Sequence, residues 1–189
     1  EGKAAKVQAL AGLVVDGDGA IFFARGNAIC VLRDGHVTTI AGVSGFPGFQ
    51  DGPCSTALFN NPRGLALGFG GLLVADMSNH CIRLITRTGE VRTLAGTGAS
   101  AGQQDGPVGS GTLHTPVGLA FDNANDLLYV SCGDHRLRGV NAEGSITTLA
   151  GTSAGSSAGY GPTVACFYNP YGIALDQEGH VYLANYSHH

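Results

Sequence analysis

The sequence repeats itself at a nearly constant interval. The segment VTTIAG at 37–42 returns as VRTLAG at 91–96 and as ITTLAG at 146–151, a period of about 54 residues. A fixed period of this size indicates a tandem array of one supersecondary unit. The 189 residues therefore hold about 3.5 such units, and the fold has to be one that stacks them.

A second landmark keeps the same period. Three prolines, each two residues before a glycine, recur at this interval: Pro62, Pro116 and Pro170. Each ends a long linker, and each linker keeps an apolar residue three positions before its proline: Phe59, Leu113 and Phe167. A flexible linker has no reason to keep an apolar residue at one place. We therefore predict that these three side chains are buried anchors that fasten the linkers to the sheets.

Each unit contains short apolar runs separated by turn residues. In the second unit the runs are 64–67, 72–75, 81–85 and 91–95, and Gly, Asn or Asp occupies the turns between them. Four such runs predict an antiparallel meander, with the two runs that are apolar on both faces inside and the alternating fourth run outside. No useful segment has helical periodicity. We expect an all-β fold with units at about 7–42, 62–96, 116–151 and, incompletely, 170–189.

Composition excludes some classes of protein. The net charge is −4 with only 10 Lys and Arg residues, and these form no basic cluster, so we expect no nucleic acid as a partner. No apolar run reaches the roughly 18 residues that a membrane span needs, so we expect no membrane partner. The five cysteines include no CxxC pair, which favours free thiols in a reducing, intracellular compartment. A disulfide between Cys54 and Cys166 remains open.

The turn between the second and third runs carries a recognisable signature. The second unit has LVAD at 73–76 followed by Asn79-His80-Cys81-Ile82, and the third has Asp134-His135-Arg136-Leu137. The first unit keeps Asn27 without the histidine, and the fourth reaches Asn185. This set resembles the NHL repeat, which implies a β-propeller of four-stranded blades that usually closes with six blades. The signature residues are Asp76, Asn79, His80, Asp134, His135 and Asn185.

The signature has a structural interpretation. We expect Asp76 to accept hydrogen bonds from backbone N–H groups of the turn that follows it, and His80 and His135 to bond the same turns without binding a metal. The segment DGDG at 16–19 lacks the glutamate that a calcium loop carries at its twelfth position, so we predict a hairpin turn there.

The resemblance allows three classes of function. Some similar propellers are lyases or lactonases that hold a metal in the central channel. The channel candidates here are Arg63, His114, Tyr168 and Tyr171. Of these only His114 is a good ligand, and a metal needs three or more. We therefore assign no catalytic residue and no cofactor. Other relatives bind single-stranded RNA on a basic face, which the charge of this chain disfavours.

The remaining class is a protein-interaction scaffold, which we favour. Its contact surface would consist of the long loops 42–61, 96–115 and 151–169, with Asp51, Gly52, Asp105, Gly106 and Tyr160 as contact residues. Because 3.5 units cannot close a six-bladed ring, we expect an open arc completed by a protein partner or by the remainder of the same polypeptide. The segment 7–12 resembles 37–42, so it is either an atypical first strand or the outer strand of another blade.

Overall fold

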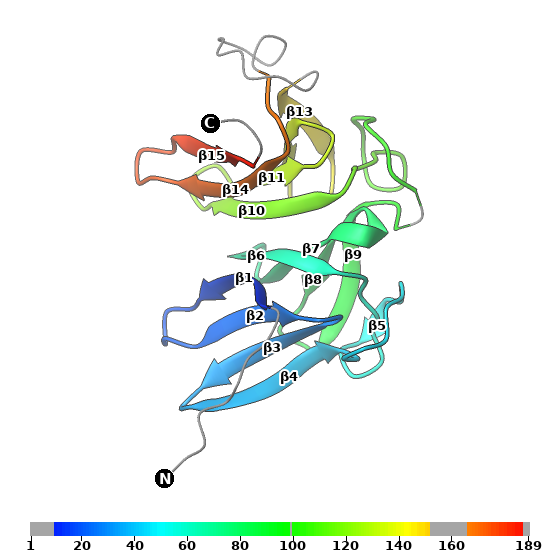
Figure 1. Cartoon of the computed structure of the whole chain (residues 1–189), viewed down its shortest axis with the longest axis vertical. Helices are drawn as coiled ribbons and strands as arrows, with labels where there is room; N and C mark the ends of the chain where they lie inside the picture. Colours follow the sequence, from blue (N-terminus) through cyan, green and yellow to red (C-terminus); the bar gives the residue numbers. More distant parts are fainter. Residues whose placement is uncertain (1–9, 99, 152–165, 187–189) are drawn as a thin grey trace.

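The computed structural model describes residues 10–98, 100–151 and 166–186. The chain forms antiparallel sheets arranged as successive blades along an arc (Figure 1). These residues contain one 3₁₀ turn, η1 (Met77–Asn79), and no α-helix, which confirms the all-β prediction. They include no helix of the length and apolarity that a membrane crossing requires.

The first two blades are complete. Blade 1 runs from inside to outside as β1 (Leu10–Val15), β2 (Ile21–Arg25), β3 (Ala28–Arg33) and β4 (His36–Gly42). Blade 2 has β6 (Pro62–Gly68), β7 (Gly71–Asp76), β8 (Cys81–Ile85) and β9 (Glu90–Gly96), and the two-residue strand β5 (Gly52–Pro53) pairs with the outer strand β9.

The sheets of blades 3 and 4 continue the same strand order from inside to outside. Blade 3 has β10 (Pro116–Asp122), β11 (Leu127–Cys132), β12 (Arg136–Val140) and β13 (Ile146–Ala150), and blade 4 has the described strands β14 (Pro170–Leu175) and β15 (Val181–Asn185). Pro62, Pro116 and Pro170 are the first residues of the inner strands β6, β10 and β14. Each follows a residue with positive φ: 56° at Asn61, 44° at Thr115 and 46° at Asn169. The same backbone turn therefore leads into three successive blades.

The inner strands β1, β6, β10 and β14 lie next to one another in this order around the inside of the arc (Figure 1). The glycine two residues after each proline explains how closely they approach. A Cβ atom at Gly64 would collide with the carbonyl of Val117, and one at Gly118 would collide with the carbonyl of Tyr171. Gly12 meets the carbonyl of Arg63 in the same way, so the inner strands pack backbone against backbone.

The core lies between the blades. One buried cluster joins blades 1 and 2 and includes Ile29, Phe59 and Val74, and a second joins blades 2 and 3 and includes Leu73 and Leu128. The two end blades leave large apolar side chains exposed, namely Leu10, Leu13 and Val15 on β1 and Tyr171, Tyr182 and Tyr186 on or beside the strands of blade 4. The described residues form an arc and not a closed ring.

The structure answers two questions that the sequence left open: where residues 10–12 pair, and whether Cys54 and Cys166 form a disulfide. Residues 10–12 belong to β1 and pair with β2, so they are not the outer strand of another blade. Residues 7–9 lie outside the described part. All five cysteines are described and none forms a disulfide, which rules out the Cys54–Cys166 bridge in this structure.

Candidate functional site

The turn before each proline is held by a side chain of the preceding blade. His80 Nδ1 accepts a hydrogen bond from the backbone N–H of Thr115 at 3.1 Å. His135 Nδ1 accepts one from the backbone N–H of Asn169, also at 3.1 Å. Blade 1 has Asn27 at this position, and its Oδ1 accepts from Asn61 at 3.0 Å. The expectation that the histidines bond their own turns is therefore wrong: they join one blade to the next.

A second side chain, from the blade that the proline begins, bonds the residue two positions before that proline. Asp76 Oδ1 accepts a hydrogen bond from the backbone N–H of Asn60 at 2.8 Å, and Asn185 Oδ1 accepts one from Tyr168 at 3.4 Å. In blade 3 Cys132 takes the same place, opposite the proline that begins the inner strand. Asp76 thus bonds the turn that leads into its blade, and not, as expected, the backbone of the turn that follows it.

Two further signature residues complete this arrangement. Asn79 donates through Nδ2 to Asp76 Oδ2 and to the carbonyl of Gly48, both at 2.8 Å. Asp134, at the corresponding position of blade 3, pairs instead with Arg136 at 2.9 Å. Burial raises the pKa of Asp76, and the hydrogen bonds from Asn60 and Asn79 and the charge of Arg83 oppose this rise without cancelling it. The signature residues therefore have a structural role, because they hold the backbone at the start of the inner strands.

A buried arginine on the third strand of blade 2 fastens the preceding loop to the sheet. Arg83 is fully buried and pairs with Asp76 at 2.9 Å and with Asp51 at 2.6 Å. It also donates to the carbonyls of Gln50 and Leu58. Since four separate acceptors from the loop and the sheet converge on one guanidinium, the loop before blade 2 is fixed along its length.

Blade 3 repeats this contact in a reduced form. Arg138 is also fully buried and pairs with Asp105 at 2.7 Å. Asp105 in turn accepts from the backbone and the hydroxyl of Thr148. Cys132 stands where blade 2 has Asp76, and Arg138 Nε and Nη1 are left buried without a hydrogen-bond partner in the described part of the chain. One sequence change therefore removes half of the ion-pair network.

The backbone of the two described loops is also repeated. Gly48 N–H donates to Phe59 O, and at the corresponding place of the next loop Gly102 N–H donates to Leu113 O. Leu58 and Gln50 exchange backbone hydrogen bonds, and Thr112 N–H donates to Gln104 O in the same way. Two loops of different sequence thus have the same internal bonding, so they are ordered parts of the blades and not free linkers.

Most of the residues that we expected to contact a partner form bonds within the molecule instead. Asp51 and Asp105 hold the two buried arginines, so much of their hydrogen-bonding capacity is used inside the molecule. Gly52 belongs to β5, and Gly106 exchanges backbone bonds with Ile146. Tyr160 lies outside the described residues. The exposed apolar side chains of these loops are others, namely Phe46 at 65%, Phe49 at 44% and Val108 at 56% exposure.

The three anchor positions are not equally buried. Phe59 and Leu113 are completely buried, and the ring of Phe59 lies 5.1 Å from the Arg83 guanidinium. Phe167 is half-buried. Its ring nevertheless meets Gly151 as the ring of Phe59 meets Gly42, because a Cβ atom at either glycine would come within 2.9 Å of the ring. Blade 4 has only two described strands, which leaves Phe167 with less cover.

Aromatic and imidazole rings gather at the ends of the inner strands where the prolines lie. His80 and His114 have ring centroids 5.8 Å apart, and His135 and Tyr168 have theirs 5.5 Å apart. Burial, and secondarily the nearby His114, lowers the pKa of His80. Among the described residues no group of three His, Cys, Asp or Glu side chains is placed to hold a metal ion. His114 has His80 near it, but no third such side chain joins them in the described part of the chain.

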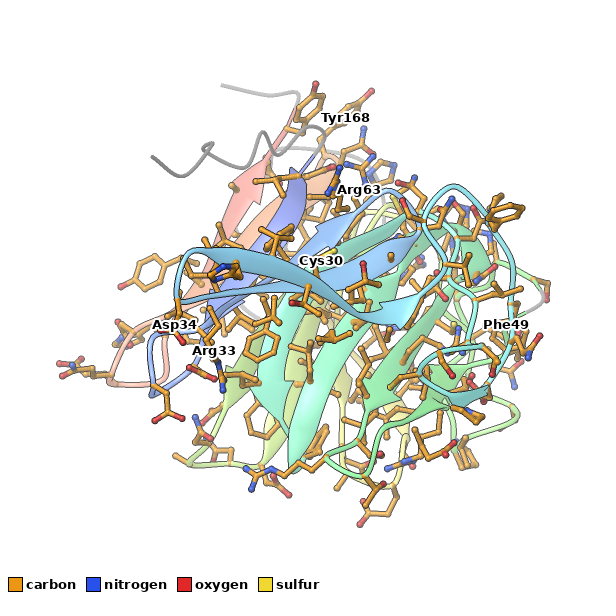
Figure 2. The ribbon with its side chains drawn as sticks, turned by 90° about the horizontal axis from the view of Figure 1, so that it is seen from below. Cys30, Arg33, Asp34, Phe49, Arg63 and Tyr168 are labelled. Carbon is orange, nitrogen blue, oxygen red and sulfur yellow. The ribbon has the colours of Figure 1, made fainter. Side chains whose placement is uncertain are left out.

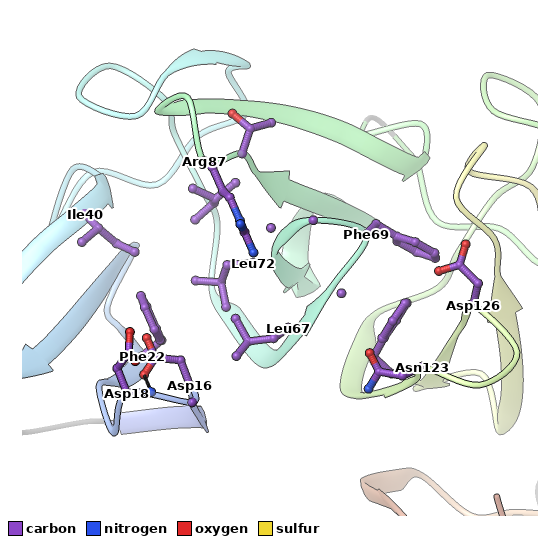
Figure 3. A pocket seen from close by; sticks show the side chains of 17 residues that line it. Asp16, Asp18, Phe22, Ile40, Leu67, Phe69, Leu72, Arg87, Asn123 and Asp126 are labelled. Carbon is purple, nitrogen blue, oxygen red and sulfur yellow. Dashed lines mark hydrogen bonds between the residues drawn. The ribbon is translucent and has the colours of Figure 1, made fainter.

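The channel candidates Arg63 and Tyr171 line one shared cavity with the other inner strands. A larger hollow, of about 830 Å³, lies at the opposite ends of the strands, among the hairpins of blades 1, 2 and 3 (Figure 3). Apolar side chains such as Phe22, Leu67 and Phe69 and polar ones such as Asp18 and Arg87 line it together.

Comparison with known proteins supports the repeat assignment. The chain is 34% identical over 142 residues to Protein SUPPRESSOR OF QUENCHING 1, chloroplastic, of Arabidopsis thaliana, which covers 71% of this chain and 14% of that protein. It is 30% identical over 146 residues to NHL repeat-containing protein 2 of Gallus gallus, covering 69% of this chain and 20% of that protein. The chain belongs to the NHL-repeat β-propeller family. No family profile matches it, and it spans about a fifth or less of these relatives.

Solved structures show the same fold. An auxiliary nutrient binding protein from Bacteroides ovatus has a TM-score of 0.72 at 19% identity and covers 97% of this NHL-repeat chain and 47% of its own. A virginiamycin B lyase from Staphylococcus aureus has a TM-score of 0.60 at 18% identity, covering 94% and 49%. A gluconolactonase from Xanthomonas campestris also has 0.60, at 15% identity, covering 98% and 57%. At these identities the likeness shows the propeller fold alone.

The ion pairs between the loops and the buried arginines were not predicted from the sequence. Arg83 and Arg138 lie one repeat apart, and so do Asp51 and Asp105. This paired repetition is a signal that was present in the sequence. Phe46 and Phe49 gave no such signal, because Ser100 and Gln103 occupy the corresponding positions of the next repeat.

Proposed function

We propose that this chain is a protein-interaction module whose contact surface is centred on the loop 43–51. The observation that carries the proposal is the exposure of Phe46 and Phe49 on a loop that is otherwise fixed to the blade. Phe49 lies at the edge of the molecule (Figure 2), with its ring 4.9 Å from the Arg83 guanidinium. Rigid, exposed aromatic side chains are common anchors of protein interfaces because little entropy is lost when they are buried.

The repeat itself supports a role for these rings outside the fold. The corresponding residues of the next loop are Ser100 and Gln103, and that loop has the same internal backbone bonds. The ring of Phe46 is therefore not needed to build the loop, whereas the ring of Phe49 also covers the Arg83 guanidinium. An exposed aromatic side chain that the scaffold does not require is typical of a contact surface.

The test exchanges these residues for those of the next blade. The 189-residue chain, immobilised, is compared with Phe46→Ser/Phe49→Gln and with the control Arg92→Gln, an exposed residue on β9. We expect the wild type and the control to retain the same proteins, and the double variant to retain none of them. The control should melt at the same temperature as the wild type. If the double variant retains the same proteins in the same amounts, the loop is not the contact surface.

An enzymatic role, as in the lyase and the gluconolactonase of the same fold, is the alternative. It requires at least three convergent ligands or a comparable reactive set, and the described residues supply no such metal group. Elemental analysis of the purified chain separates the two functions, since a metal that is bound stoichiometrically and removed by chelator favours the enzyme. Retained partners that chelator does not release favour the interaction module.

We propose in addition that further protein covers the two end blades. Leu13 on β1 and Tyr182 on β15 are exposed, and the corresponding residues Leu65 and Leu73 are buried between successive blades. In the inner blades such faces form the core, so covering the end faces would remove the same kind of surface from water.

A further inference from the structure

The part of the channel wall that the described inner strands form contains one charged side chain. The four inner strands line a cavity of about 380 Å³, and each contributes residues from near its start. Arg63 and Tyr171 are the only ionisable residues of this wall among the described residues, and it includes no Asp or Glu. The positive charge of Arg63 is therefore not balanced by any carboxylate of the wall.

Within the described ranges Arg63 also lacks hydrogen-bond partners. Its Nε atom is buried and meets no acceptor in the described part of the chain, and its guanidinium makes no ion pair with the residues described there. A buried donor without an acceptor costs about 1–3 kcal/mol, and more when the donor carries charge. Such a cost calls for an explanation in an otherwise well-bonded blade.

The fold does not require an arginine at this position. The residue between the proline and the glycine is Val117 in blade 3 and Tyr171 in blade 4, and Ala11 takes the corresponding place in blade 1. The structural arginine of blade 2 is Arg83, whose guanidinium is occupied by two carboxylates and two carbonyls. Arg63 has none of these roles.

We propose that Arg63 binds a carboxylate group of a ligand that enters the channel. The two Nη groups of a guanidinium donate side by side to the two oxygens of a carboxylate. A carboxylate there would balance the only charge that the described residues of the wall carry. The hydroxyl of Tyr171, in the same wall, provides a further donor for an oxygen of the ligand.

The site is distinct from the loop surface proposed above, because Arg63 belongs to the inner strand β6 and Phe46 to the loop before it. The Arg63 Nε–H signal can be followed by nuclear magnetic resonance while sodium succinate is added to the 189-residue chain, with sodium chloride at equal ionic strength as the control. We expect saturable binding of succinate in the millimolar range. Loss of a charged hydrogen bond predicts at least tenfold weaker binding by Arg63→Gln.

Two further variants make the test specific. Arg63→Lys keeps the charge but loses the planar edge, so it should bind succinate more weakly than the wild type and more tightly than Arg63→Gln. Arg87→Gln removes an exposed arginine from the opposite ends of the strands and should bind as the wild type does. Circular dichroism and thermal melting confirm that each variant is folded. Arg63→Val, which introduces the residue of the next blade, replaces any variant that does not fold.

A second titration identifies the source of the carboxylate. Acetyl-Glu-Glu-Glu-amide is compared with succinate, and tighter binding of the peptide assigns the site to an acidic protein segment. Tighter binding of succinate assigns it to a small organic acid. The proposal is overturned if neither probe saturates the Arg63 signal, or if Arg63→Gln and the wild type bind both probes equally. Because Phe46 variants do not touch this site, failure of the loop proposal would leave these results unchanged.

Discussion

His80 Nδ1 and the backbone N–H of Thr115 form a 3.1 Å hydrogen bond that joins blade 2 to blade 3. The two residues stand 35 positions apart in the sequence. His80 has a φ of 54°, so the left-handed backbone at the end of η1 directs its ring toward the next blade. The histidine of the repeat signature is therefore a link between blades, and its imidazole has to be neutral at Nδ1 to accept the bond.

Replacing His80 by asparagine should preserve this link. Asn27 makes the same bond in blade 1 with its side-chain oxygen, and asparagine tolerates a positive φ better than most residues. We expect His80→Asn to unfold in urea within about 0.5 kcal/mol of the wild type, and His80→Ala to lose about 1 kcal/mol. Equal losses for the two variants would contradict the role assigned to the acceptor atom.

The wild type and His80→Asn also test a pH dependence. Burial and the neighbouring His114 lower the pKa of His80 from its ordinary value of 6.5, so the folded chain holds this proton less tightly than the unfolded chain does. Stability from His80 is therefore complete above pH 6.5 and is lost as the pH falls through 6.5 toward the lowered folded pKa. We expect the difference in stability between wild type and His80→Asn to move against the wild type between pH 7 and pH 5. A constant difference over this range would contradict the prediction.

The two buried arginines should differ in their contribution to stability. Arg83→Met leaves Asp76 buried without its counter-ion, and loss of one partner of a buried pair costs about 3–5 kcal/mol. Arg138→Met leaves Asp105, whose side chain is 47% exposed and is held by Thr148, and it removes two buried donors that have no partners in the described part of the chain. We expect it to cost no more than about 1–2 kcal/mol in urea unfolding at pH 7. Arg87→Met is the exposed control, and an equal or larger loss for Arg138→Met than for Arg83→Met would contradict the comparison.

The stability lost when a loop anchor is replaced by alanine should increase with the burial of its side chain. Phe59 is completely buried between blades 1 and 2, so Phe59→Ala should cost about 3–5 kcal/mol of unfolding free energy. Phe167 is half-buried, and Phe167→Ala should cost clearly less. Calorimetric melting of the two variants beside the wild type measures both. A similar loss at the two positions would show that the anchors are equivalent in spite of their different exposure.

Much of the fold could be predicted because the repeat constrains every unit at once. The period predicted the four-stranded blades. The proline and glycine positions predicted where the inner strands begin. The glycines recur because the backbone of the next inner strand leaves no room for a Cβ atom at Gly64 or Gly118. The direction of the His80 bond could not be predicted in the same way. Its donor belongs to the next blade, and the repeat alone does not say whether a polar side chain bonds its own turn or a neighbouring one.

The buried charges were not predicted for a related reason. Arg83 alternates with apolar residues on β8, a pattern typical of a strand with one face in water, yet all five residues of β8 are buried. The loop before blade 2 covers that face and brings Asp51 with it, so a long-range contact overrides the local pattern. Because of this contact Asp51, which we expected on the contact surface, is a structural residue.

The exposed ends of the arc lead to the last prediction. Leu10, Leu13 and Val15 on β1 and Tyr171, Tyr182 and Tyr186 on or beside blade 4 are between 42% and 75% exposed, whereas the inner faces of blades 2 and 3 are buried. A strand surface of this kind tends to pair or to aggregate unless further protein covers it. We expect the isolated 189-residue chain to self-associate in sedimentation velocity, and Leu13→Lys with Tyr182→Lys to reduce this association, because charge on the same faces opposes their burial. Arg92→Lys, on the outer strand β9, is the control and should behave as the wild type does. A stable and soluble monomer at all concentrations, with no partner present, would show that the end blades need no cover.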